Sequence, residues 1–119
     1  MRTLRINPDI EAVEVMEVDG NNYKAMNEAI GIDTGSTLGF TYGNERYYLW
    51  LDDNGVFASP PKRKFYCPKI HPQPLIGQAL IYKSDGRDGL ERCDIPADVV
   101  AQWLGYKEAT EDIIEDSPE

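Results

Sequence analysis

Apolar and polar residues alternate through much of the first half of the chain, and this alternation predicts β-strands. Leu4 and Ile6 share one side of the first expected strand. Val13 and Val15 alternate with acidic residues, which favours a second strand with one solvated face. Residues 37–61 hold half of the twelve aromatic residues, and we place the centre of a sheet there. The expected strands cover residues 2–6, 12–18, 37–42, 46–51, 56–59, 75–82 and 90–94.

Turn-forming residues predict how these strands are connected. Asn54-Gly55 is the strongest hairpin signal, with residues 56–59 as its return strand, ended by Pro60-Pro61. Residues 60–74 contain five prolines and predict a long irregular loop. Gly77 interrupts the apolar run 75–82 and predicts a bulge or a close approach of another chain segment.

Two segments show helical spacing. Tyr23, Met26 and Ile30 would share one stripe of a helix over residues 23–30. Asn21 or Asn22 would be its N-cap, and Gly31 its end.

A second helix is expected over residues 96–104. Asp94 would be its N-cap and Gly105 its end. Its apolar face would consist of Val99, Val100, Trp103 and Leu104.

The element order ββα-βββ-βα predicts an α+β fold. We expect a mainly antiparallel sheet of about five to six short strands, with two helices packed on one face. Residues 1–106 would form a single domain, and residues 107–119 an acidic, flexible tail. An exposed edge strand of such a sheet could pair with its copy, so a homodimer is one expectation.

Charge and composition disfavour several classes of function for this protein. The net charge is −9, which disfavours bulk binding to DNA or to anionic lipid. The tail contributes −5 and the remaining chain −4, so the domain itself is only mildly acidic. No apolar run approaches the ~20 residues of a membrane helix, and the N-terminus lacks a secretory pattern. Two cysteines are too few for a disulfide framework, which favours a reduced, cytoplasmic setting.

The best candidate for a functional surface is the basic segment, residues 60–66. Its cations Lys62, Arg63 and Lys64 can meet a phosphate, and Tyr66 or Trp50 can stack on a base. Other cations that would join them if the fold brings them near are Arg46, Lys83 and Arg87. The plainer reading is a solubilising loop that offsets the acidic domain.

Other candidate chemistry is thinly supported. Cys67, His71 and Cys93 do not have the spacing of a four-ligand zinc site and are more simply read as reduced thiols and a loop histidine. We expect no metal and no cofactor. Since His71 is the only histidine, a small hydrolase with His71 as its base is the third-ranked reading.

Several segments together resemble a known family. These are the turn Asn54-Gly55, the step from Pro60 to Arg63, the glycine-containing strand 75–82 and the helix 96–104. The chain is similar here, and over roughly residues 1–105, to members of the domain of unknown function 3846 family. That resemblance implies a small α+β protein from a phage or other mobile element, and implies no activity. Lys62 stands where the family pattern has Asn.

We therefore expect an accessory protein that acts by binding rather than by catalysis. Its ligand would be a small phosphorylated molecule such as a nucleotide, held by the basic segment. The alternative is a modulator or inhibitor of a host protein that acts through the acidic surface.

Overall fold

A computed structural model describes residues 1–20, 22–55, 62–84 and 90–107. It shows the predicted α+β class, with antiparallel strands and two short helices. In chain order the elements are β1 (Arg2–Asn7), β2 (Ala12–Glu17), α1 (Tyr23–Ala29), β3 (Gly35–Tyr42), β4 (Glu45–Asp52), β5 (Lys64–Phe65), β6 (Leu75–Ile76), β7 (Ala79–Ser84), β8 (Leu90–Glu91) and α2 (Ala97–Ala101). None of the described helices is long and apolar enough to cross a membrane.

The main sheet has six strands, and its path runs β2-β1-β7-β4-β3, with β8 paired to β7. All of its pairings are antiparallel. β5 and β6 form a separate two-stranded sheet. The central strand β7 buries both of its faces, with Ala79 and Ile81 on one side and Leu80 and Tyr82 on the other. This explains its nearly continuous apolar sequence.

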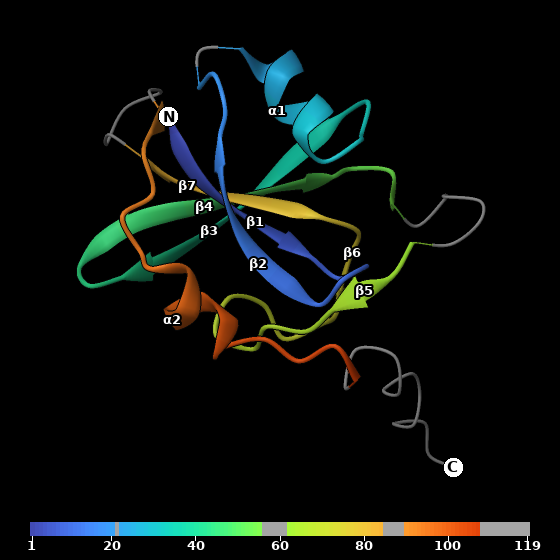
Figure 1. The fold of residues 1–119 in the computed structure, drawn as a ribbon. Helices are drawn as coiled ribbons and strands as arrows, with labels where there is room; N and C mark the ends of the chain where they lie inside the picture. Colours follow the sequence, from blue (N-terminus) through green and yellow to red (C-terminus); the bar gives the residue numbers. More distant parts are fainter. Residues whose placement is uncertain (21, 56–61, 85–89, 108–119) are drawn as a thin grey trace.

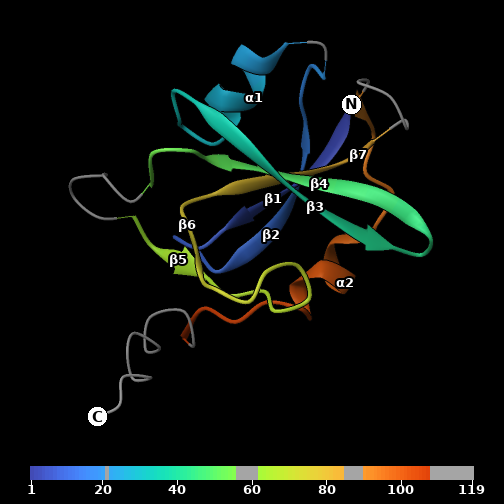
Figure 2. The same cartoon turned by 180° about the vertical axis from the view of Figure 1, so that it is seen from behind.

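The two helices lie on opposite faces of the main sheet, as Figures 1 and 2 show. Met26 and Ile30 of the α1 segment pack with Leu80. Val100 of α2 packs with Ile81, the next residue along β7, whose side chain points the other way. The prediction that both helices share one face is therefore wrong. We call the two sides the α1 face and the α2 face.

The aromatic stretch is divided between these faces by strand alternation. Phe40 and Tyr47 stack on the α2 face, with ring centroids 5.7 Å apart. Tyr48 and Trp50 lie on the α1 face. Residues close together in sequence therefore serve two separate layers of the core.

The tight hairpin of the sheet lies at Gly43-Asn44, between β3 and β4. Both residues have positive φ, 59° and 65°, as a two-residue type I′ turn requires. Asn54-Gly55, the predicted hairpin, has no positive φ at either residue. The predicted hairpin is wrong, because both edges of β4 are already paired, one with β3 and the other with β7, which leaves no edge for a return strand after Gly55. The expected return strand 56–59 lies outside the described residues.

The apolar run 75–82 is two strands rather than one. Gly77, with φ of 85°, separates β6 from β7 and donates its N–H to the carbonyl of Arg63 at 2.8 Å. The glycine thus marks a change of sheet together with a close approach. The predicted irregular loop 60–74 is partly ordered as well, since β5 pairs with β6.

α1 forms where the sequence predicts it. Asn22 is the N-cap, and its side chain accepts hydrogen bonds from the N–H groups of Lys24 and Ala25. Of the predicted stripe, Met26 and Ile30 are buried, whereas Tyr23 is 54% exposed and stacks on Trp50.

α2 is shorter than predicted. It ends at Ala101, and Gly105 instead exchanges two backbone hydrogen bonds with Tyr66, at 2.7 and 2.8 Å. This bridge needs extended backbone, which excludes a helix through residue 104. Asp94 is not the N-cap either, because Pro96 holds that position and Asp94 forms ion pairs with Lys83 and Arg92.

β2 does not have the single solvated face that its alternation predicts. Val13 packs against the α2-face core and Met16 against the α1-face core, while Val15 is 54% exposed. β2 is an edge strand, so its side chains are covered less completely than those of its neighbour β1.

Candidate functional site

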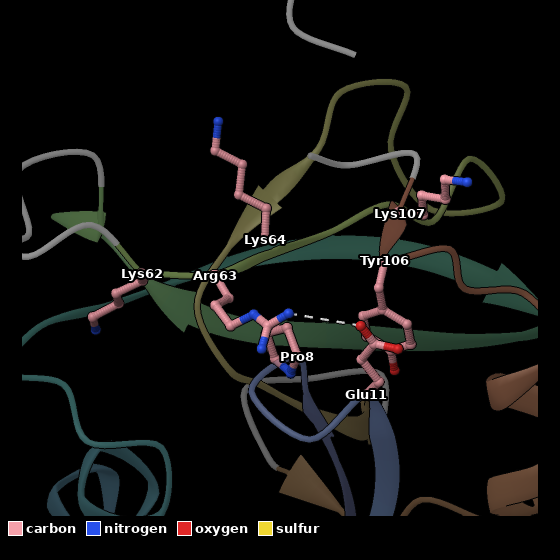
Figure 3. A pocket seen from close by; sticks show the side chains of 7 residues that line it. All are labelled: Pro8, Glu11, Lys62, Arg63, Lys64, Tyr106 and Lys107. Atoms are coloured by element: carbon pink, nitrogen blue, oxygen red, sulfur yellow. Dashed lines mark ion pairs between the residues drawn. The ribbon is translucent and has the colours of Figure 1, made fainter. Parts of the chain in front are cut away.

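A pocket of about 770 Å³ lies at the rim of the α2 face, where three distant chain segments meet (Figure 3). The loop between β1 and β2, the basic segment at β5 and the segment that follows α2 all contribute to it. Its lining residues are Pro8, Glu11, Lys62, Arg63, Lys64, Tyr106 and Lys107. The bridge between Tyr66 and Gly105 brings the last segment beside β5.

The loop between β1 and β2 is shaped by its own hydrogen bonds. The Asn7 side chain accepts from the N–H of Asp9 at 3.1 Å, and the N–H of Ile10 donates to the Asn7 carbonyl at 3.3 Å. Glu11 then adopts a φ of 54°, a left-handed conformation that few non-glycine residues take. This loop conformation places the Glu11 carboxylate on the wall of the pocket.

Arg63 spans the pocket toward that carboxylate, as the dashed line in Figure 3 shows. Its guanidinium lies 3.7 Å from Glu11, and it donates to the Asp9 carbonyl at 3.4 Å. The Arg63 and Glu11 side chains are 61% and 55% exposed. An exposed pair at this distance contributes little to stability, so a better anion can displace Glu11 from Arg63.

Lys62 forms an ion pair with a residue outside the pocket. Its ammonium lies 2.7 Å from a carboxylate oxygen of Asp52, and Figure 3 shows the side chain directed away from Arg63. Burial alone would raise the pKa of Asp52, but hydrogen bonds from Lys62 and the Asn54 amide and the Lys62 charge outweigh it and lower that pKa. Lys62 therefore lines the pocket mainly with the aliphatic part of its side chain.

Lys64 and Lys107 line the pocket, and neither forms an ion pair with another described residue. Of the eleven described lysines and arginines, eight contact a carboxylate, a backbone carbonyl or an aromatic ring through their side chains. Within the described residues, the remaining three are Lys24, Lys64 and Lys107. Two of these three line the same pocket.

Tyr106 is a pocket residue that sequence reasoning missed. Burial raises the pKa of its hydroxyl, and the nearby Glu11 carboxylate adds to this effect. The residue follows the predicted end of the second helix, and no local pattern links it to the basic segment. Only the backbone bridge at Gly105 makes the connection.

The two aromatic residues predicted to join the cations do not line the pocket. Tyr66 contributes its backbone to the bridge with Gly105. Trp50 lies on the α1 face, where its indole N–H donates to the Asn27 side chain at 2.9 Å and its ring stacks on Tyr23 at 5.3 Å. Strand alternation directs Trp50 away from the face that carries the pocket.

The further cations considered from the sequence also lie elsewhere. Arg46 covers the Tyr48 ring, and Lys83 pairs with Glu45 and Asp94. Both lie at one end of the paired strands β4 and β7. Asp52, which binds Lys62, lies at the other end of β4. Arg87 and the tail residues 108–119 lie outside the described residues.

His71 and the two cysteines do not form a common centre. The His71 Nδ1 atom lies 3.1 Å from the backbone nitrogen of Gln73, within its own turn. Cys67 and Cys93 are free, fully buried thiols, and burial raises the pKa of each. Among the described residues, no group of three histidine, cysteine or acidic side chains is arranged to hold a metal.

Comparisons with protein-family models, with curated proteins and with solved structures find no match to this chain. The resemblance to the domain of unknown function 3846 family therefore stays a prediction that depends on the residues quoted for it. Function has to be argued from the pocket itself.

Proposed function

We propose that this protein is a binding module, acting in the cytoplasm of a bacterial host, that captures a small phosphorylated ligand in the pocket beside Arg63. On this reading it is an accessory protein of a phage or mobile element, as the family resemblance implies. The observation that carries the proposal is the placement of Lys64 and Lys107. Neither has a carboxylate partner among the residues that the structure describes, and both line one cavity of a protein whose net charge is −9.

Arg63 supplies the anchoring group. A guanidinium can bind a phosphate through two parallel N–H···O bonds, which an exposed carboxylate at 3.7 Å does not match. The ligand would displace Glu11 and draw the flexible Lys64 and Lys107 side chains inward. Tyr106 is the aromatic residue beside these cations, and it replaces Trp50 and Tyr66 as the group that would contact a base or sugar.

The first test is isothermal titration calorimetry with pyrophosphate and with adenosine diphosphate as probes. We expect the combined substitution Arg63→Ala and Lys64→Ala to weaken binding at least about tenfold, because each charge-assisted hydrogen bond contributes about 1.5–3 kcal/mol. Glu11→Gln should act in the opposite direction. It removes the competing carboxylate and should tighten binding by up to about fivefold, since exposed pairs contribute up to about 1 kcal/mol.

A matched control is available elsewhere on the surface. Arg92 forms an exposed pair with Asp94, and Lys24 is the third unpartnered lysine of the described chain. Arg92→Ala with Lys24→Ala makes the same change in net charge and should leave binding unaltered. The proposal is wrong if neither probe binds the unaltered protein. It is also wrong if the control pair weakens binding as much as the pocket pair.

A further inference from the structure

β3 is an edge of the main sheet, and within the described chain only β4 pairs with it. Its eight residues, Gly35–Tyr42, include no charged residue and no proline. All eight are in continuous register with β4, so no bulge interrupts the strand. Natural sheets protect long edges with lysines, prolines or bulges, and β3 has none of these.

The hairpin geometry identifies which backbone groups face outward. Tyr42 and Glu45 flank a two-residue turn and therefore exchange hydrogen bonds with each other. The bonded pairs then alternate along the strand, and the bond from the Asp53 N–H to the Thr34 carbonyl continues the same pattern. The outward N–H and C=O groups consequently belong to Gly35, Thr37, Gly39 and Thr41.

The opposite edge of the sheet is built differently. β2 carries the carboxylates Glu14 and Glu17, and α2 packs against this strand. A second protein chain approaching β2 would meet carboxylates and a helix. At β3 it would meet strand residues without charge, with the Arg46 side chain of β4 lying over Gly39. Thr37 and Thr41 are solvent-exposed, and the glycines add no side-chain barrier.

We propose that β3 pairs with β3 of a second copy of this chain, extending the sheet through a two-fold axis near Gly39. In that antiparallel register Thr37 faces Thr41 of the other copy on the α1 face. Leu38 faces Phe40 on the α2 face. Threonine pairs and apolar pairs are favourable cross-strand neighbours. Such an interface is self-complementary, as a two-fold dimer requires.

Charge disfavours the pairing of two copies through β2 and leaves β3 as the edge strand without carboxylates. Each chain carries a net charge of −9, so association needs a contact that brings no carboxylates together. β3 meets this requirement, and β2, with two carboxylates, does not. The proposed dimer is independent of ligand capture, because the pocket is lined by none of the β3 residues.

Analytical ultracentrifugation of the full chain over a dilution series tests the proposal. The unaltered protein should sediment at twice the 13.4 kDa chain mass. The variant Thr37→Lys with Thr41→Lys should fall twofold, to the chain mass, because it places like charges across the pairing edge. Both threonines are exposed, so circular dichroism should show an unchanged fold. Val15→Lys, at the exposed position on β2, is the matched control and should remain dimeric.

Amide hydrogen exchange locates the contact directly. The N–H groups of Thr37, Gly39 and Thr41 should be protected in the dimer and should lose that protection in the lysine variant. Those of Leu38 and Phe40 bond to β4 and should remain protected in both. A monomeric unaltered protein overturns the proposal. Dissociation by Val15→Lys, or a dimer in which the outward amides of β3 exchange freely, overturns it as well.

Discussion

The two faces of the main sheet are covered in different ways. On the α1 face a single short helix closes a compact aromatic layer, in which Trp50 is held by both Tyr23 and Asn27. The α2 face is covered by pieces from several segments, including α2, β5 and the residues around Cys67 and Cys93. A face assembled from separate pieces leaves irregular rims, and the pocket lies at one of them. The difference shows why the candidate site belongs to the α2 face.

The largest expected effect on stability comes from truncating a buried leucine in the core on either face of the sheet. Leu80 on the α1 face and Leu49 on the α2 face are both fully buried. Leu80→Ala and Leu49→Ala should each lower the free energy of unfolding by about 2–5 kcal/mol in urea denaturation. Because both thiols belong to the α2 face, Leu49→Ala should also accelerate their labelling more than Leu80→Ala does. Equal acceleration by the two variants would show that the layers open together.

A smaller effect separates the two tryptophans, one on each face. Trp50→Phe removes the hydrogen bond to Asn27 and should cost about 1–3 kcal/mol, since it leaves a partly buried acceptor without its donor. Trp103 packs edge-on against Phe40 and has no such bond within the described residues. Trp103→Phe should therefore cost less than Trp50→Phe in the same denaturation assay. The reverse order would show that the hydrogen bond to Asn27 is not what makes Trp50 the more costly of the two to replace.

The smallest effect is a pH dependence at the rim of the pocket. The pKa of Asp52 is lower in the folded protein than its ordinary value, so its carboxylate stabilises the fold above the unfolded-state pKa. That contribution is lost as the pH falls through the folded-state pKa. Asp52→Asn should cost about 1 kcal/mol at neutral pH and progressively less in acid. A cost that does not change with pH would mean that Lys62 does not stabilise the charged form.

The sequence also predicted site residues unevenly. Consecutive placement was enough to identify Lys62, Arg63 and Lys64 as neighbours, and all three line the pocket. It was not enough to predict their partners. Asp52 engages Lys62, Glu11 faces Arg63, and Tyr106 joins from the far end of the domain. Each of these contacts joins residues ten or more positions apart, beyond the reach of any local pattern.

By itself the sequence determined several local elements: the strands β1 to β4, the helix α1, and the α+β class. These depend on alternation, helical spacing and turn residues, which act over a few neighbouring positions. Only the tertiary structure decided which face each aromatic residue lies on and which segments enclose the pocket. The reason is physical. A strand's partners and the side of the sheet that a helix covers are set by burial and hydrogen bonding between segments far apart in the chain, such as Tyr66 with Gly105.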